Sequence, residues 1–124
     1  MSEPANALPA DALLALKARL REFAEERDWT QFHTPKNLAM ALAGEAGEVL
    51  EHFQWLTAEQ SAAPDAALRG AVALELADVL MYLVRLADVL DVDLAAAAAR
   101  KLAINAERYP AEKARGRADK YDQL

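Results

Sequence analysis

Two stretches of 19 residues match each other at an offset of 30 residues, and this repeat constrains the fold more than any other feature. Residues 38–56 read LAMALAGEAGEVLEHFQWL and residues 68–86 read LRGAVALELADVLMYLVRL, with seven identical positions. Wound as helices at about 100° per residue, each stretch places its apolar side chains and one glutamate, Glu45 or Glu75, in a stripe about 60° wide. A core-facing carboxylate is costly unless it meets a cation. The repeat therefore predicts two packed helices built around a cation site.

A second pair of acids supports this prediction. Glu48 and Asp78 are matched across the repeat and flank the stripes on the same side. Spacing i, i+3 lets both acids of one helix reach a common ion, and a short connection makes the helices antiparallel, so that the two pairs face each other. Oxygen ligands suit Mg²⁺, with Mn²⁺ as the alternative, and such ions keep positions open for water and phosphate oxygens. The four acids predict a magnesium site suited to phosphoryl chemistry.

Two other interpretations of these acids are weaker. Acids in helices usually pair with a Lys or Arg three or four residues away, and none of the four has such a neighbour. Di-iron carboxylate bundles use Glu-x-x-His pairs, whereas neither His33 nor His52 lies three residues after a glutamate. A bound hard cation explains the pattern better than a solvated face or a di-iron centre.

Composition narrows the class of protein. The chain of 124 residues is 54% hydrophobic with only 4 glycines, and alanine and leucine dominate, which favours an all-α fold. The formal net charge of −6 argues against nucleic-acid binding over a broad surface, and the lack of cysteine excludes disulfides. The N-terminal sequence does not resemble a signal peptide, and no stretch has the apolar length of a membrane span. We expect a cytoplasmic protein with no membrane partner.

The pattern predicts one helical domain with short extensions. Residues 1–10 are expected to form a flexible leader, 11–110 the domain, and 111–124 a polar tail that is exposed or docked on a partner. Thr34 and Asp93 are placed as helix caps, and Pro110 should end the last helix. Four helices are expected, over residues 11–27, 35–56, 66–90 and 94–109, with a surface loop over 57–65.

Aromatic and basic residues near the acids have two interpretations each. Trp55 and Tyr82 lie seven residues after Glu48 and Glu75, and so about two helical turns along, where they either pack in a core or a dimer interface or stack on a flat base. Residues Lys101, Asn105 and Arg108 share one helix face, which is either solvated or in contact with phosphates. His33 fits a hydrogen-bonded turn histidine better than a ligand or base.

The acid motif resembles that of a known family. The pattern E-x-x-E, 26 residues, E-x-x-D resembles the motif of the MazG-like all-α nucleoside triphosphate pyrophosphohydrolases. The segments RDWTQFHTPKNLAMALAGEAGEVLEHFQW, LELADVLMYLVRLA and KLAINAERYP resemble the dCTP pyrophosphatase branch of that family. The likeness runs from Leu20 to Pro110, and the tail sequence KYDQL is also similar.

The resemblance implies a fold, an assembly and a reaction. The fold would be a four-helix-bundle-like, antiparallel MazG-type fold that forms a homodimer or homotetramer, with active sites near the subunit interface. The reaction would cleave a nucleoside triphosphate between the α and β phosphates, releasing the monophosphate and pyrophosphate. Glu45, Glu48, Glu75 and Asp78 would hold Mg²⁺. Our own mechanistic hypothesis, separate from the resemblance, makes Glu48 and Glu45 catalytic, with Glu48 accepting the proton of the attacking water.

The resemblance also assigns substrate contacts. Trp29, Trp55 and His33 would form or border the base and sugar pocket. Sugar or phosphate contacts would come from Tyr82, Lys101, Asn105, Tyr109 and Arg108.

One departure leaves the preferred base open. Leu20 stands where related dCTP enzymes have a histidine near the base, and a leucine cannot make that polar contact. The most favoured substrate is dCTP or a modified dCTP, and the alternatives are dUTP, a broad set of triphosphates, or a non-enzymatic helical module that binds metal.

Overall fold

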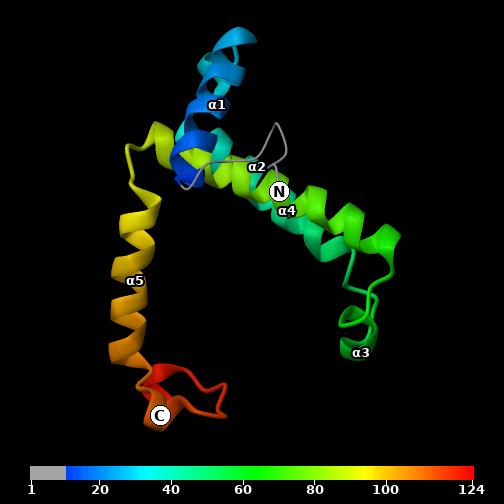
Figure 1. Cartoon of the computed structure of the whole chain (residues 1–124), viewed down its shortest axis with the longest axis vertical. Helices are drawn as coiled ribbons and strands as arrows, with labels where there is room; N and C mark the ends of the chain where they lie inside the picture. The colour runs from blue at the N-terminus through cyan, green and yellow to red at the C-terminus, as the bar shows by residue number, and fades with distance from the viewer. Residues whose placement is uncertain (1–10) are drawn as a thin grey trace, which may run out of the picture. The chain divides into compact units, whose positions relative to one another are not determined.

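The computed structural model describes residues 11–124, in which every regular element is helical, so the all-α prediction is confirmed. The expected leader, residues 1–10, lies outside the described residues. The elements follow the chain in this order (Figure 1): α1 (Ala12–Glu26), the 3-10 helix η1 (Thr30–Phe32), α2 (Pro35–Glu51), α3 (Ala58–Ser61), α4 (Ala66–Val89), α5 (Leu94–Arg108), α6 (Ala111–Ala114) and the 3-10 helix η2 (Tyr121–Gln123).

Helix starts follow the capping residues in the sequence. The Thr34 side chain accepts a hydrogen bond from the backbone N–H of Asn37 at 3.2 Å, and Pro35 occupies the first helical position of α2. Asp93 accepts from the backbone N–H of Ala96 at 3.0 Å and starts α5 in the same way. These bonds satisfy N–H groups that have no partner within the helix. Both predicted caps are confirmed.

The expected end of α2 near Leu56 is wrong, because the helix ends at Glu51. The backbone N–H groups of Phe53 and Gln54 both donate to the carbonyl of Leu50 at 2.9 Å, so the chain leaves the helix through a tight turn. The turn leads into a reciprocal capping box in which Thr57 and Gln60 hydrogen-bond each other and start the single turn of α3. This strong local signal for a new helix competes with continuation of α2.

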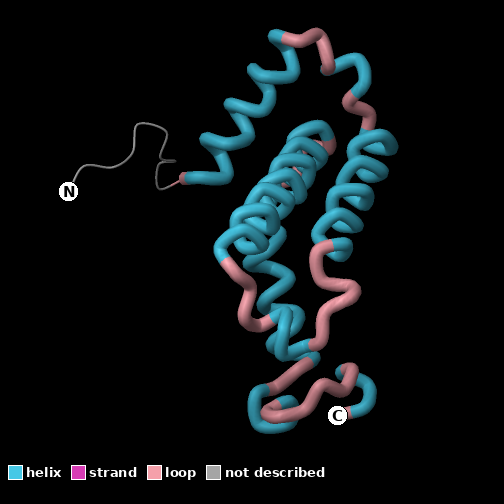
Figure 2. The backbone as a smooth tube through the Cα atoms, turned by 90° about the vertical axis from the view of Figure 1, so that its right-hand side faces the viewer, coloured by secondary structure: helices cyan, strands magenta, loops and turns pink. Residues whose placement is uncertain are grey.

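α2 and α4 pack side by side as antiparallel neighbours (Figure 2). His33, just before α2, bonds to Arg85 near the end of α4, whereas His52, just after α2, lies near Glu75 in the first half of α4. Sequence numbers thus rise along one helix as they fall along the other, which confirms the predicted antiparallel pair. α1 also packs against α4.

The chain forms two compact units, Met1–Asp91 and Val92–Leu124. Few side chains are fully shielded in the described residues: Leu38, Ala24, Val84 and Ala87 form the apolar core, together with the charged residue Arg85. Glu45 and Glu75, the acids of the two predicted stripes, are half-buried. Within residues 11–124, no helix is long and apolar enough to cross a membrane.

Candidate metal and nucleotide site

Three carboxylates meet between α2 and α4. Glu45, Glu48 and Glu75 each offer an oxygen, and these oxygens lie within 4.8 Å of one another. The i, i+3 spacing on α2 puts Glu45 and Glu48 one turn apart on neighbouring faces, and the antiparallel pairing brings Glu75 to them from α4. We refer to Glu45, Glu48 and Glu75 as the carboxylate cluster.

Burial divides the cluster into two kinds of carboxylate. Glu45 and Glu75 are half-buried, whereas Glu48 is exposed. The Oε2 atoms of Glu45 and Glu75 are shielded from solvent and have no hydrogen-bond partner among the described residues. Buried carboxylate oxygens are normally hydrogen-bonded or bound to a cation. The two orphaned oxygens and the all-oxygen donor set fit a divalent metal ion.

Mutual repulsion perturbs the titration of the cluster. Burial raises the pKa of Glu45, and the neighbouring Glu48 carboxyl and the charges of Asp78 and Glu75 act in the same direction. A hydrogen bond with the Glu48 carboxyl raises the pKa of Glu75, as do burial and the charges of Glu48 and Asp78. Two acids held close together cannot both ionise without cost. A bound cation would remove this repulsion and keep the carboxylates charged.

Two further groups border the cluster. Asp78, the fourth predicted ligand, lies outside the group of three but is close enough for its charge to raise the pKa of both Glu45 and Glu75. The Nε2 atom of His52 lies 3.8 Å from Oε1 of Glu75, and the electrostatic effect of this neighbour lowers the pKa of that glutamate. The structure therefore brings all four predicted acids into one neighbourhood.

Trp29 and His33 lie together in the turn between α1 and α2. The turn passes through Asp28, which adopts a positive φ of 55°, and the Trp29 backbone N–H donates to the carbonyl of Ala24 at 2.9 Å. The Trp29 ring lies edge-on to Phe23 at 5.7 Å and to His33 at 6.4 Å, measured between ring centroids. Because Trp29 remains 44% exposed, much of its indole surface is available for stacking.

Trp55 and Tyr82 lie in different structural elements and differ in solvent exposure. The expectation that Trp55 lies two helical turns after Glu48 is wrong, because α2 ends at Glu51 and Trp55 falls in the following turn, where it is 86% exposed. Tyr82 lies on α4 as expected and is half-buried. Burying so exposed an indole would require a ligand or another protein surface.

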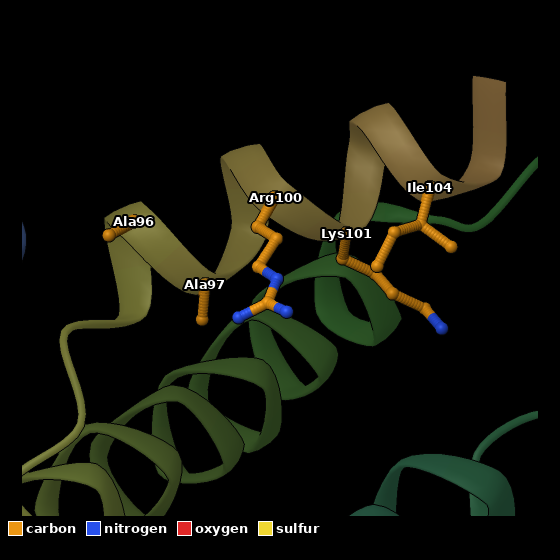
Figure 3. A pocket seen from close by; sticks show the side chains of 5 residues that line it. All are labelled: Ala96, Ala97, Arg100, Lys101 and Ile104. Carbon is orange, nitrogen blue, oxygen red and sulfur yellow. The ribbon is translucent and has the colours of Figure 1, made fainter. Parts of the chain in front are cut away.

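The remaining predicted contacts lie on the second unit. Lys101, Asn105 and Arg108 belong to α5, as predicted, and Tyr109 caps its end. Lys101 lines a shallow groove with Arg100, and both side chains extend from the same side of α5 (Figure 3). The other lining residues of this groove are Ala96, Ala97 and Ile104, also on α5.

Tyr121 of the tail contacts two residues at the end of α5. The Tyr121 ring lies edge-on to Tyr109 with centroids 6.1 Å apart. The Arg108 guanidinium lies 4.8 Å from the Tyr121 ring centroid, within the range of a cation–π contact. The tail also contains the short elements α6 and η2. Its Tyr121 ring contacts Tyr109 and Arg108, two residues that were predicted to contact the substrate.

The sequence analysis missed an ion-pair network centred on Asp88. Arg85 and Asp88 lie one turn apart on α4 with side chains 8% and 5% exposed, and Arg85 Nη1 donates to Asp88 Oδ2 at 3.0 Å. Arg21 of α1 donates from its Nε to the same Asp88 carboxylate at 3.0 Å, and Arg85 Nε donates to Nδ1 of His33 at 3.0 Å. The signal available in the sequence was an Arg and an Asp at i, i+3 within the mainly apolar second half of α4.

Comparison with known proteins gives a consistent picture. A model of the MazG-like family matches residues 41–124. dCTP pyrophosphatase 1 from Homo sapiens is 47% identical over 118 residues, which cover 94% of this chain and 69% of that protein. The Mus musculus protein of the same name is 44% identical over 126 residues, covering 99% of this chain and 74% of that protein. The crystal structure of a pyrophosphatase from Archaeoglobus fulgidus superposes with a TM-score of 0.71 at 35% identity, covering 88% of this chain and 99% of that one.

Proposed function

The chain belongs to the MazG-like family, and on that premise we propose that it hydrolyses dCTP, or a modified dCTP, to the monophosphate and pyrophosphate. The carboxylate cluster is the single observation that carries this proposal, because its all-oxygen donor set and orphaned oxygens suit a divalent cation of the kind that binds triphosphates. The names of the relatives support a nucleotide pyrophosphatase and point to dCTP among the substrates.

Mg²⁺ is the ion we propose, with Mn²⁺ as a substitute. Glu45, Glu48, Glu75 and Asp78 would hold it. A bound divalent ion supplies charge neutralisation for the triphosphate and a more acidic water. Glu48 is the exposed member of the cluster, so its carboxylate is accessible to a water molecule and is our candidate for accepting the proton during attack at the α-phosphorus. Glu45, which is half-buried, would help to orient the ion and the attacking water beside Glu48.

We assign the nucleotide contacts by their chemistry. The exposed indoles of Trp29 and Trp55 offer flat surfaces for the base, and His33 beside Trp29 offers a polar group for the base or sugar. Tyr82 lies one turn beyond Asp78 and would contact the sugar or phosphates. The same role on the second unit is proposed for Lys101, Asn105, Arg108 and Tyr109, whose cationic and polar groups suit phosphate oxygens.

The preferred base is the part of the proposal with a specific rival. Leu20 is half-buried on α1 and offers no polar atom to a base, so cytosine loses one means of recognition. This observation favours dUTP or a broader set of triphosphates as the second candidate.

A nucleotide panel tests the proposal and its rival together. Purified protein would be incubated with dCTP, 5-methyl-dCTP, dUTP, dTTP and dATP, with and without Mg²⁺, while released pyrophosphate is measured. We expect turnover of dCTP that requires the metal and is lost in Glu45→Gln. Glu22→Gln is the matched control, because Glu22 is an exposed glutamate of α1 outside the cluster. Equal turnover of all bases would favour the broad-specificity candidate, and thermal stabilisation by Mg²⁺ without pyrophosphate release would contradict enzymatic activity.

Assembly into a homodimer or homotetramer is also part of the proposal. The exposed leucines on α4 include Leu76, Leu80 and Leu83, which share one helix face at spacing i, i+4, i+7. Few side chains of the described residues are fully shielded within the single chain. Exposed apolar side chains of this kind are stabilised when a partner buries them, and we propose that a second copy of the chain is that partner.

A further inference from the structure

Arg85 meets His33 at one specific ring nitrogen. The Nε of Arg85 donates to Nδ1 of His33 at 3.0 Å, and the Arg85 side chain is only 8% exposed. A guanidinium offers N–H donors and no acceptor, and it stays charged at all ordinary pH values. Nδ1 of His33 must therefore accept this bond with its lone pair, and it cannot carry a proton while the contact exists.

The geometry points to Arg85 as a positioning residue that holds His33 as the neutral tautomer with its hydrogen on Nε2, so that His33 presents a hydrogen-bond donor to the nucleotide. This inference rests on the proposed function where it takes His33 as a substrate contact. The bond between Arg85 and His33 stands independently of that assignment. It also defines a role for the buried network on α4 that the carboxylate cluster does not explain.

The surroundings of His33 favour the neutral ring. The cation of Arg85 lies against the imidazole, and although Asp88 partly neutralises Arg85, Asp88 is shared with Arg21 of α1. Lys17 of α1 adds a further positive charge near Asp88. Burial and the Arg85 charge together lower the pKa of His33. The burial of His33 and its contact with Arg85 thus disfavour the protonated imidazolium form of His33 at neutral pH.

The tautomer limits what His33 can do. With Nε2 protonated and Nδ1 occupied, the ring has no free lone pair and cannot take a proton from water, so it does not act as a general base. It can donate to an acceptor atom, and cytosine offers two on its pairing edge, the O2 oxygen and the N3 nitrogen. A nucleotide group that only donates would gain nothing from this ring.

The first test uses the unmodified protein. Two-bond ¹H–¹⁵N correlation spectra report which nitrogen of a histidine carries hydrogen, and the chain has only two histidines, so His33→Gln assigns the signals. We expect His33 at pH 7 to show the neutral Nε2–H pattern. A neutral Nδ1–H pattern, or an imidazolium pattern, would overturn the inference without any variant of Arg85.

The second test separates the direct bond from general loosening of the network. In Arg85→Met the ring should become a mixture of tautomers, and its titration midpoint should rise because the adjacent cation is gone. Arg21→Met is the matched control, since it removes the other arginine from Asp88 but leaves the Arg85–His33 bond in place. Equal changes in the two variants, or none in Arg85→Met, would overturn the inference. If Arg85→Met does not fold, the spectra of the unmodified protein still decide which nitrogen of His33 carries the hydrogen.

Kinetics test the link to substrate. Arg85→Met should raise KM for dCTP roughly three- to tenfold, the effect of losing one oriented hydrogen bond, with a smaller change in kcat. In a His33→Gln background the same substitution should add almost nothing to KM. Independent, multiplying effects would contradict a role through His33. If wild-type protein releases no pyrophosphate from any triphosphate, the proposed function fails, while the spectra still decide the tautomer.

Discussion

Glu45 and Glu75 occupy positions where a helix pair would otherwise bury apolar side chains, and each has a buried oxygen without a partner among the described residues. Their pKa values are raised, so without metal the folded state pays for keeping them ionised at neutral pH. Residues that bind a ligand commonly cost stability when the ligand is absent. Stability and function should therefore oppose each other at these two positions.

Glu45→Gln should reveal this opposition. In metal-free protein at pH 7 we expect a higher melting temperature than wild type, because one of the mutually repelling charges is removed. The stabilisation that Mg²⁺ gives to wild type should shrink, and dCTP turnover should be lost. Thermal unfolding with EDTA and with Mg²⁺ measures both effects, and Glu22→Gln serves as the control. A variant less stable than wild type in EDTA would contradict the repulsion argument.

Asp88 is predicted to stabilise the fold in a pH-dependent way. The hydrogen bond from Arg21 and the charges of Arg21 and Arg85 lower the pKa of Asp88, against the effect of burial. A carboxyl with a lowered folded-state pKa contributes stability above its unfolded value, about 3.9, and loses it as the pH falls through the folded value. At pH 7, Asp88→Asn should cost about 3 kcal/mol, because it leaves the Arg85 charge buried with a weaker partner.

Urea denaturation at a series of pH values checks this prediction. The difference in unfolding free energy between wild type and Asp88→Asn should be largest near neutral pH and should narrow below pH 4. Asp91→Asn is the control, since Asp91 is exposed and asparagine tolerates its positive φ of 56°. A difference that stays constant down to acid pH would show that charge at Asp88 is not its source.

At the scale of single elements, local sequence was a good guide to where helices start and a poorer guide to where one of them ends. Thr34, Asp65 and Asp93 all cap helices through side-chain oxygens, and a cap acts within one turn of its own position. The end of α2 depended on competition between continued apolar periodicity and the capping box at Thr57. That competition moved Trp55 out of the helix.

Removal of the α2 cap should have a moderate effect on stability. Thr34→Ala deletes the acceptor for the Asn37 N–H and should lower the unfolding free energy by about 1 kcal/mol. Thr34→Ser retains the hydroxyl and should lose less than half of that amount. Chemical denaturation of the two variants measures the difference. Equal losses in both would indicate that the methyl group, rather than the hydrogen bond, matters.

At the scale of the whole molecule, several large apolar side chains among residues 11–124 are exposed on the single chain. Leu74 is 72% and Leu76 is 53% exposed on α4, and Met40 on α2 is 64% exposed. Leu76, Leu80 and Leu83 share one exposed face of α4, and an exposed apolar face of this kind marks an interaction surface. This surface carries the proposal of self-assembly, and the expected division into domain 11–110 and tail 111–124 stays a prediction beside the two compact units.

Leu80→Glu should shift the protein toward monomer. Leu80 is 40% exposed at the centre of the leucine face of α4, and a charge there would be buried in any interface that this face forms. Light scattering coupled to size-exclusion chromatography measures the mass. Ala99→Glu adds the same charge at an exposed position of α5 and should leave the mass unchanged. A monomeric wild type, or an unchanged mass in Leu80→Glu, would contradict the assembly proposal.

The sequence by itself determined where the long helices begin, their caps and the acids that they carry, because helical periodicity and capping act over one to two turns of chain. Glu45, Glu48, Glu75 and Asp78 could be named from spacing alone. Only the tertiary structure decided the register of α2 against α4, the exposure of Glu48 and the bond between Arg85 and His33, which are 52 residues apart. Such contacts depend on how turns close and how helices pack, and no local spacing encodes them.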